Sequence, residues 1–215
     1  MQYVLLDLDG TLTNPKLGIT KSIQYALKAY NIIEEDLDSL CKYIGPPLWV
    51  SFKEYHGIRE DQIDEVIEKY REYFAVTGIY ENEAYEGIEE CLAKLKEEGK
   101  VLIVATSKPE IFAKKILEYF GIDGYFTDIC GSTLDGSRST KEAVIRYALE
   151  KNNITDVNSV VMVGDRLHDI EGAKAVGIAS IGVLYGFGSR EELEEYKADR
   201  IVESVDELYE VVMDL

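Results

Sequence analysis

The chain has 215 residues, of which 46% are apolar and 30% charged, so it has the composition of an ordinary globular protein with one sizeable core and room for a small second lobe. Its formal net charge of −18 argues against nucleic-acid polymers and anionic membrane surfaces as main partners, because both are bound through clustered Lys and Arg. Three widely spaced cysteines without histidines at metal-ligand spacing support neither a disulfide framework nor a zinc site. We expect Cys41, Cys91 and Cys130 to be buried thiols.

The N-terminal segment opens directly on Tyr3-Val-Leu-Leu and meets an acidic residue, Asp7, after one short apolar run. A signal peptide would need a basic region and a longer apolar stretch, and a membrane span would need about 20 apolar residues. We therefore expect a cytoplasmic protein without a membrane partner.

Short apolar runs alternate with longer segments of helical periodicity along most of the chain. This pattern is typical of strands joined by crossover helices, and it predicts an α/β fold with a parallel sheet. The predicted strands are residues 3–8, 101–105, 160–163 and 179–184, with weaker ones at 128–130 and 200–202. The helices predicted around them are residues 87–98, 109–120, 141–151 and 205–213.

Residues 14–83 break this alternation, because they contain helical periodicity without a convincing strand. The helices predicted within them are residues 19–30, 36–43, 48–55 and 61–74. We therefore expect a sheet-containing core domain, residues 1–13 and 84–215, and an inserted helical domain, residues 14–83. Ligands of open parallel sheets bind beyond the carboxyl ends of the strands, so an insert that follows the first strand could act as a lid.

The first predicted strand runs into Asp7-Leu-Asp9-Gly10-Thr11. Residues two apart in extended chain project to the same side, so both carboxylates can address one site, where a bound cation would offset their repulsion. Mg²⁺ fits best because it accepts oxygen ligands, retains waters and also holds a substrate phosphate. A calcium loop is disfavoured, because its fifth and twelfth positions would be Thr11 and Gly18, whereas a plain turn at Gly10 stays open.

A second predicted strand end carries hydroxyl groups. Residues 101–105 lead into Thr106-Ser107-Lys108, where a hydroxyl and the N–H groups at a helix start could cradle a phosphate. The alternative is that Thr106 or Ser107 is simply a helix cap, and this segment alone does not decide between the two readings.

A third predicted strand end repeats the pattern of an apolar run followed by acids. Residues 160–163 lead into Gly-Asp165-Arg-Leu-His-Asp169. Asp165 and Asp169 offer one or two more carboxylates for a metal ion, although either could be a helix cap if it stood alone.

The order of these motifs resembles the haloacid dehalogenase (HAD) superfamily: Asp-x-Asp-Gly-Thr from residue 7, a hydroxyl after a later strand, a lysine, and Gly-Asp-x-x-x-Asp from residue 164. The resemblance spans nearly the whole chain. It implies a Rossmann-like three-layer core with a parallel sheet, an inserted α-helical cap domain, and a phosphatase that depends on Mg²⁺.

The resemblance also implies roles for the acids. Asp7 matches the nucleophile that attacks phosphorus, and Asp9 matches the acid–base residue that protonates the leaving oxygen and then activates water. The Mg²⁺ ligands would be the Asp7 carboxylate, the Asp9 backbone carbonyl and Asp165. Asp169 would lie nearby as an outer or alternative ligand.

Candidates for binding the phosphoryl group follow from the same resemblance. Thr106 matches the hydroxyl that contacts this group, with Gly10 and Ser107 as further candidates beside it. Lys141 matches the lysine that neutralises charge on the nucleophile and the phosphate, and Lys108 competes for that role. The alternative for Lys141 is an ordinary solvated lysine.

Within the superfamily the chain resembles the phosphoglycolate phosphatases and bacterial 5′-nucleotidases that carry a helical cap after the first motif. Residues 131–138 resemble the nucleotidase-like members and make Arg138 a further phosphate-binding candidate. Trp49, Phe52 and Tyr55 could stack on a nucleobase, although aromatics at helical spacing are more often core.

We therefore expect a Mg²⁺-dependent enzyme that hydrolyses a small phosphorylated metabolite, of phosphoglycolate or nucleoside 5′-monophosphate type, as a monomer or homodimer. Two alternatives stay open: a phosphomutase of the same superfamily, and a catalytically silent binding module on the same fold. The acids at Asp7, Asp9 and Asp165 disfavour the silent module.

Overall fold

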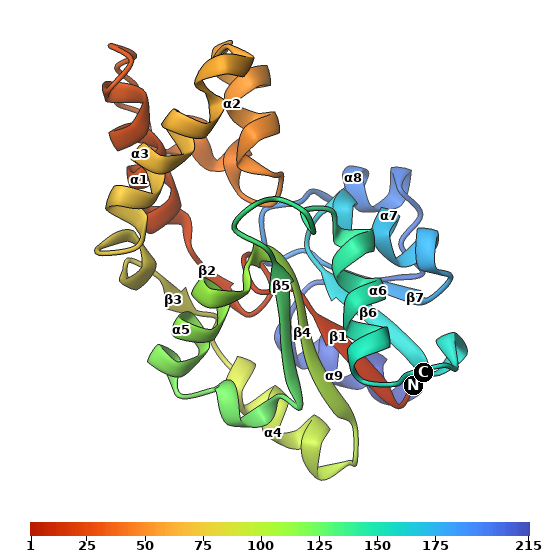
Figure 1. Cartoon of the computed structure of the whole chain (residues 1–215). Coiled ribbons are helices and arrows are strands. Elements are labelled where there is room, and N and C mark those ends of the chain that lie inside the picture. Colours follow the sequence, from red (N-terminus) through yellow and green to blue (C-terminus); the bar gives the residue numbers. More distant parts are fainter. The chain divides into compact units, whose positions relative to one another are not determined.

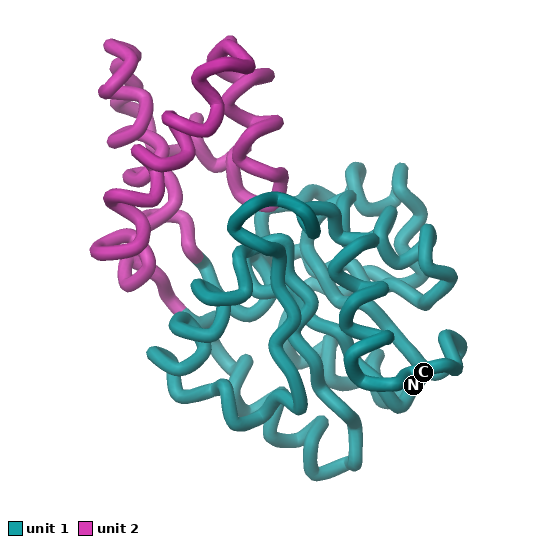
Figure 2. Tube along the Cα trace, in the orientation of Figure 1, with its two compact units in different colours: residues 1–14, 84–215 teal, residues 15–83 magenta.

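The computed structural model describes residues 1–215 and divides the chain into two compact units (Figure 2). Unit 1 comprises Met1–Asn14 and Ala84–Leu215, and unit 2 comprises Pro15–Glu83. The chain therefore leaves unit 1 shortly after its first strand and returns to it about seventy residues later. Two short strands that pair with each other, β2 (Thr13–Asn14) and β3 (Glu83–Ala84), mark these two connections.

Unit 1 is built on a six-stranded sheet whose spatial order is β5-β4-β1-β6-β7-β8 (Figure 1). All of its strand pairs are parallel, so the prediction of a parallel α/β fold is confirmed. The strands are β1 (Tyr3–Leu6), β4 (Val101–Pro109), β5 (Asp128–Ser132), β6 (Val160–Gly164), β7 (Ala179–Val183) and β8 (Arg200–Val202). Every predicted strand is present, including the two weaker ones.

Helices cover both faces of this sheet and complete the predicted three-layer architecture (Figure 1). Helices α6 and α7 pack against each other over one face, and α4 and α9 pack against each other over the other. The helices of unit 1 are α4 (Ile88–Glu97), α5 (Glu110–Phe120), α6 (Lys141–Lys151), α7 (Leu167–Val176), α8 (Arg190–Glu195) and α9 (Val205–Asp214). Two 3₁₀ turns, η4 (Asp123–Tyr125) and η5 (Val157–Ser159), precede β5 and β6.

Alternate residues of the central strands fill the two halves of the core. Leu5 of β1 is in register with Ile103 of β4 and Met162 of β6, and all three belong to the cluster that packs against α6. Their neighbours along the strands are equally buried, and side chains of successive strand residues point to opposite faces. The near-continuous apolar runs in the sequence reflect this burial on both faces.

The position of β1 between β4 and β6 decides where a site can form. β4 lies on one side of β1 and β6 lies on the other. The connections of the chain therefore run to opposite sides at the carboxyl end of β1. Such a switch point is where open parallel sheets bind ligands. The residues after β1, β4 and β6 are therefore brought to one edge of the sheet.

Unit 2 is helical, with α1 (Lys16–Lys28), α2 (Leu48–His56), α3 (Ile63–Phe74) and three 3₁₀ turns, η1 (Asp38–Tyr43), η2 (Glu60–Gln62) and η3 (Gly78–Tyr80). The α-helix predicted over residues 36–43 is wrong, because this segment forms only the 3₁₀ turn η1. The side chains of Glu34 and Asp36 accept backbone N–H groups of Asp36 and Asp38, and these local bonds compete with a regular helix start.

The burial of side chains in unit 2 favours the core reading for one of the three aromatic residues and corrects the expectation for Cys41. Phe52 is fully buried, so it belongs to the core and cannot stack on a nucleobase. Tyr55 packs edge-on against Tyr43. Trp49, by contrast, is 47% exposed. Cys41 is only partly buried, unlike the two buried cysteines of unit 1, because it lies on the short turn η1. None of the helices in either unit combines the length and apolar character that a membrane crossing requires.

Leu5→Ala tests the assignment of the core. Leu5 has no exposed surface in the central strand, so we expect the truncation to lower the free energy of unfolding by about 2–5 kcal/mol, the range for buried Leu→Ala changes. Urea unfolding followed by circular dichroism measures this loss. The control is Leu134→Ala, which truncates a 48% exposed leucine and should change stability by less than about 0.5 kcal/mol. Equal effects of the two substitutions would contradict the placement of Leu5.

Candidate active site

The first acid of the candidate site, Asp7, directly follows β1 at the carboxyl end of the central strand. Its backbone N–H donates to the carbonyl of Val163 in β6 at 2.9 Å, so the parallel ladder continues by one residue beyond β1. The side chain is buried. The sheet itself therefore fixes the backbone from which this carboxylate projects.

Gly10 makes the sharp turn that follows Asp7, as the sequence predicts. Its φ of +87° lies in the left-handed region, and a Cβ placed on it would lie 2.2 Å from an Asp165 carboxylate oxygen. Only glycine satisfies both conditions. The Gly10 N–H already donates to the carbonyl of Thr13 at 2.8 Å, so its bond is made within the turn.

The acids after β6 are held by backbone N–H groups. Asp169 lies in the first turn of α7, and its Oδ2 accepts the N–H of Arg166 at 3.0 Å. Gly164 gives this side chain room, because a Cβ at residue 164 would lie 2.1 Å from the Asp169 Cγ. Oδ2 of Asp165 accepts the N–H of Phe187 at 2.7 Å. Both carboxylates are thus oriented by main-chain donors, and both are buried.

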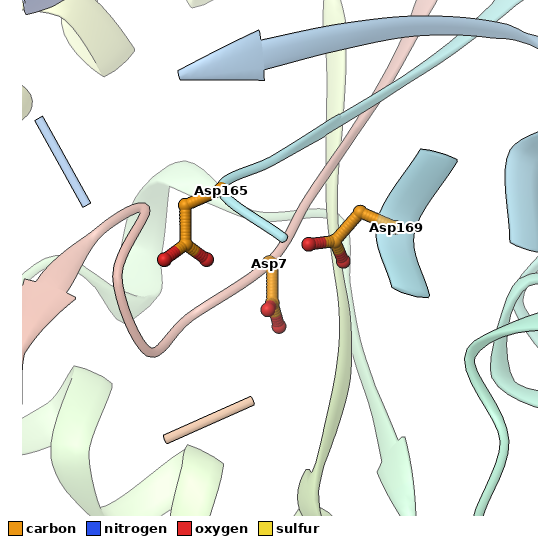
Figure 3. A group of neighbouring side chains, drawn as sticks. All are labelled: Asp7, Asp165 and Asp169. Carbon is orange, nitrogen blue, oxygen red and sulfur yellow. The ribbon is translucent and has the colours of Figure 1, made fainter. Parts of the chain in front are cut away.

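The carboxylates of Asp7, Asp165 and Asp169 converge on one point (Figure 3). Each offers an oxygen within 4.8 Å of the others, and Oδ1 of Asp165 is buried without a hydrogen-bond partner. Burial, together with the charges of the other two acids, raises the pKa of Asp165 well above its usual value. Burial is also the main cause that raises the pKa of Asp169 to about 6, against the opposing effect of Lys141.

Lys141, the first residue of α6, supplies positive charge to this acidic group. Its Nζ lies 2.8 Å from Oδ1 of Asp7 and 2.7 Å from Oδ1 of Asp169, and it donates to the carbonyl of Ala105 at 3.1 Å. Burial alone would lower the pKa of Lys141, but the two carboxylates outweigh burial and raise it. The lysine is therefore charged and buried, and it is not a solvated surface residue.

The donor set fits a divalent cation of the Mg²⁺ type. Three buried carboxylates face one lysine, which leaves an excess of negative charge, and Oδ1 of Asp165 is buried without a hydrogen-bond partner. Oxygen ligands of this kind are those that Mg²⁺ prefers, whereas zinc would favour the His and Cys ligands that are missing from this group.

Asp9 forms a second, separate ion pair. Its carboxylate lies outside the three-acid group, and Oδ2 is 2.5 Å from Nζ of Lys108. Burial raises the pKa of Asp9, and the charge of Lys108 lowers it. Burial has the larger effect, so the pKa of Asp9 is raised overall. The two candidate lysines thus contact different acids: Lys141 contacts Asp7, and Lys108 contacts Asp9.

Thr106, Ser107 and Lys108 lie within β4, which runs past its predicted end at residue 105 and continues to Pro109. The register with β5 shifts between Thr106 and Pro109, and proline holds the preceding residue in an extended conformation. The hydroxyl of Thr106 accepts the N–H of Lys108 at 3.2 Å. The helix predicted over residues 109–120 begins at Glu110, directly after the end of β4.

Arg138 contacts β5 and the neighbouring helices α5 and α6. Its guanidinium lies 3.6 Å from the centre of the Tyr147 ring, donates to the carbonyl of Gly131 at 2.8 Å and is 3.5 Å from a Glu110 carboxylate oxygen. None of these contacts involves Asp7, Asp9 or the acids after β6. They join the loop after β5 to α5 and α6.

Residues 185–188 reach the same site, although the sequence pattern alone predicts no role for them. This Tyr-Gly-Phe-Gly segment follows β7, and its Phe187 N–H is the donor to Asp165. The one available signal is a Gly-x-Gly sequence directly after a predicted strand, which marks a place of close backbone approach.

The fold and this site together define a hydrolase of the α/β structural class that acts on phosphate esters, with acids and a lysine gathered at the carboxyl ends of the central strands. The chain belongs to the haloacid dehalogenase-like hydrolase family, whose model matches residues 4–183.

Similar proteins carry phosphatase names in most cases. A 5′-nucleotidase of Pseudomonas aeruginosa is 47% identical over 90% of this chain and 87% of its own length. The crystal structure of a predicted phosphatase from Clostridium acetobutylicum is 51% identical, with a TM-score of 0.97 over 100% of this chain and 99% of that one. The tyrosine-protein kinase PtkA of Mycobacterium tuberculosis is 36% identical over 98% of this chain and 72% of its own length. Further relatives are named phosphoglycolate phosphatase.

Asp165→Asn tests the electrostatics of the acidic group. The amide keeps the shape of the carboxylate and removes its repulsion with Asp7 and Asp169, so we expect a higher melting temperature at pH 8 in EDTA, by roughly 2–4 °C for each kcal/mol gained. An acid whose pKa is raised by folding costs stability as the pH rises through that raised pKa. The gain should therefore shrink as the pH is lowered from 8 and wild-type Asp165 takes up a proton.

Thermal unfolding of the two proteins across this pH range measures the effect. Asp214→Asn, which changes an exposed acid near the C-terminus, supplies the baseline. A lower melting temperature for Asp165→Asn at pH 8 would contradict the repulsion inferred here.

Proposed function

We propose that this protein is a Mg²⁺-dependent phosphomonoesterase that hydrolyses a small phosphorylated metabolite through an aspartyl-phosphate on Asp7. The observation that carries the proposal is the buried group of Asp7, Asp165 and Asp169 with Lys141 bonded to two of the three acids. Structural ion pairs rarely leave three carboxylates with a single cation, because isolated buried charge is costly.

Mg²⁺ would be held by the carboxylates of Asp7 and Asp165 and by the backbone carbonyl of Asp9, with Asp169 as an outer or alternative ligand. When bound, the ion would neutralise charge on the transferred phosphoryl group. The excess of negative charge in the acidic group and the partnerless oxygen of Asp165 support this assignment.

Asp7 is the proposed nucleophile. One of its carboxylate oxygens attacks phosphorus, an O–P bond forms, and the bond from phosphorus to the ester oxygen breaks. Lys141 lies 2.8 Å from Asp7, so it holds this carboxylate in place and offsets the charge of the incoming phosphate. This contact favours Lys141 over Lys108 as the lysine that serves the nucleophile.

Asp9 is the proposed acid–base residue. In the first step it gives its proton to the leaving ester oxygen, and in the second it accepts a proton from the water that attacks the aspartyl-phosphate, which releases phosphate and restores Asp7. The raised pKa of Asp9 supports this role, because a general acid must hold its proton near neutral pH. Lys108 opposes the rise and so tunes the proton affinity of Asp9.

Thr106, Ser107 and Gly10 remain the proposed contacts of the phosphoryl group, with Arg138 as a more remote candidate. Phosphoryl transfer is catalysed mainly by positioning and charge neutralisation, so donors at fixed positions suffice for Thr106 and Ser107. The N–H of Gly10 is already bonded to Thr13, so the proposed contribution of Gly10 is the turn that brings the chain close to the phosphoryl group. We assign residues 1–13 and 84–215 to the catalytic core and residues 14–83 to a helical cap domain of the enzyme.

The proposed substrate is phosphoglycolate or a nucleoside 5′-monophosphate. The 47% identity to a protein named 5′-nucleotidase favours the nucleotide as substrate. Relatives named phosphoglycolate phosphatase support the smaller ester, phosphoglycolate, as the alternative. Trp49 is 47% exposed and remains a proposed stacking partner for a nucleobase, whereas phosphoglycolate has no ring with which to make such a contact.

Asp7→Asn tests the nucleophile. We expect the substitution to lower phosphate release by a factor of about 10³ or more, because no carboxylate is left to attack phosphorus. The assay uses a panel of nucleoside 5′-monophosphates, phosphoglycolate and an aryl phosphate with Mg²⁺, and it follows inorganic phosphate. EDTA should stop the wild-type reaction and added Mg²⁺ should restore it. Asp214→Asn is the matched acid-to-amide control.

Two outcomes of this panel would contradict the proposal. Substantial activity of Asp7→Asn would assign the nucleophile to another residue. Phosphate release that appears only when a sugar bisphosphate primes the reaction would indicate a phosphomutase, and the absence of any release from the panel would favour a binding module.

Lys108→Met tests the proton affinity of Asp9. Removal of the lysine charge leaves burial to raise the pKa of Asp9 further. Since Asp9 must be protonated in the first step, the alkaline limb of the pH profile of kcat/KM should move to higher pH. Lys114→Met, on the surface of α5, is the control and should leave the limb in place. An alkaline limb that stays fixed or moves to lower pH in Lys108→Met would contradict the role of Asp9.

A further inference from the structure

The segment of residues 185–188, between β7 and α8, makes the direct contact that orients Asp165. The N–H of Phe187 donates to Oδ2 of Asp165 at 2.7 Å, and Oδ1 of the same carboxylate is buried without a partner. One oxygen is thus fixed by the main chain, and the other is buried without a hydrogen-bond partner in a carboxylate that belongs to the acidic group. This is the arrangement of a carboxylate prepared to bind an ion through a single oxygen.

Two glycines bring the segment close enough for this bond. A Cβ at Gly186 would lie 2.3 Å from the carbonyl oxygen of Gly10 and 2.4 Å from the Cβ of Asp165. A Cβ at Gly188 would lie 1.9 Å from the carbonyl oxygen of Asp165. Neither glycine has a left-handed φ, so it is lack of space, and not backbone conformation, that excludes a side chain at both positions.

Tyr185 ties the same segment to the turn after β1. Its hydroxyl donates to the carbonyl of Thr11 at 3.2 Å, and its partly buried ring packs edge-on against Tyr85 with ring centres 5.0 Å apart. The segment therefore contacts both turns that carry the acids, the turn of Gly10 and Thr11 and the turn of Asp165.

Asp165 needs such support more than its neighbours do. The Nζ of Lys141 pairs with Asp7 and Asp169, and the charges of those two acids repel Asp165. A carboxylate in this position would otherwise rotate away from the group, because like charges in a buried site repel strongly. The Phe187 N–H and the close packing of the glycines oppose that rotation.

We infer that residues Tyr185–Gly188 form a clamp that positions Asp165 for the metal ion, with Tyr185, Gly186 and Gly188 as positioning residues. This inference rests on the proposed function, because it takes Mg²⁺ as the ion that Asp165 binds. Groups that orient metal ligands from outside the ligand set typically account for about 10–100-fold in metal affinity.

The test is the Mg²⁺ affinity of the full chain, measured by isothermal titration calorimetry without substrate. Gly186→Ala and Gly188→Ala should each weaken Mg²⁺ binding by about 10-fold or more. Gly124→Ala is the matched control, because nothing lies within 4 Å of a Cβ at that position and its φ is not left-handed. Its Mg²⁺ affinity should equal that of the wild type.

Tyr185→Phe keeps the inference testable if the alanine variants fail to fold. It removes only the hydroxyl bond to Thr11 and should weaken Mg²⁺ binding while the melting temperature in EDTA stays near that of the wild type. At saturating Mg²⁺ its kcat should return towards the wild-type value, which a general loss of structure would not allow.

The outcomes separate this inference from the proposed function. Wild-type affinity for Mg²⁺ in every folded variant of Tyr185, Gly186 and Gly188 overturns the clamp and leaves the phosphatase proposal standing. A wild-type chain that binds no Mg²⁺ overturns both. Mg²⁺ binding that weakens in these variants supports the clamp even if the substrate panel releases no phosphate.

Discussion

The structure is organised around a buried excess of negative charge. Asp7, Asp165 and Asp169 present oxygens within 4.8 Å of one another, and Lys141 is the cation that contacts two of them. Charges removed from water are stable only when they are paired and hydrogen-bonded. The lysine and the main-chain donors of Arg166 and Phe187 meet part of that requirement, and a divalent cation would meet the remainder.

The sheet topology makes this concentration of charge possible. β1 lies between β4 and β6, so residues from distant parts of the sequence arrive at one edge while each stays attached to a rigid strand or to the first turn of a helix. Lys141 begins α6 and Asp169 lies in the first turn of α7, and these two helices pack against each other. Helix packing thus sets the distance between the lysine and the acid.

The sequence is informative where chemistry follows directly from local pattern. The apolar runs predict all strands of the six-stranded sheet, and the three acids follow two neighbouring parallel strands, Asp7 after β1 and Asp165 and Asp169 after β6. The sequence is less informative where contacts between distant residues determine the local structure. The closeness of Gly186 to Gly10 depends on tertiary packing, and the short turn at residues 38–43 depends on side-chain bonds from Glu34 and Asp36 that a helical periodicity does not reveal.

The three acids are held by different means, and this difference matters for how an ion would bind. Asp7 is held by a lysine, Asp169 by a lysine and an N–H group, and Asp165 by an N–H group alone. In Asp165 and Asp169 the oxygen that accepts the N–H is Oδ2, which leaves Oδ1 buried and without a hydrogen bond from the main chain. Because the backbone sets these orientations before an ion arrives, little side-chain freedom is lost when it binds, and the cost of ordering is met by folding instead of by binding.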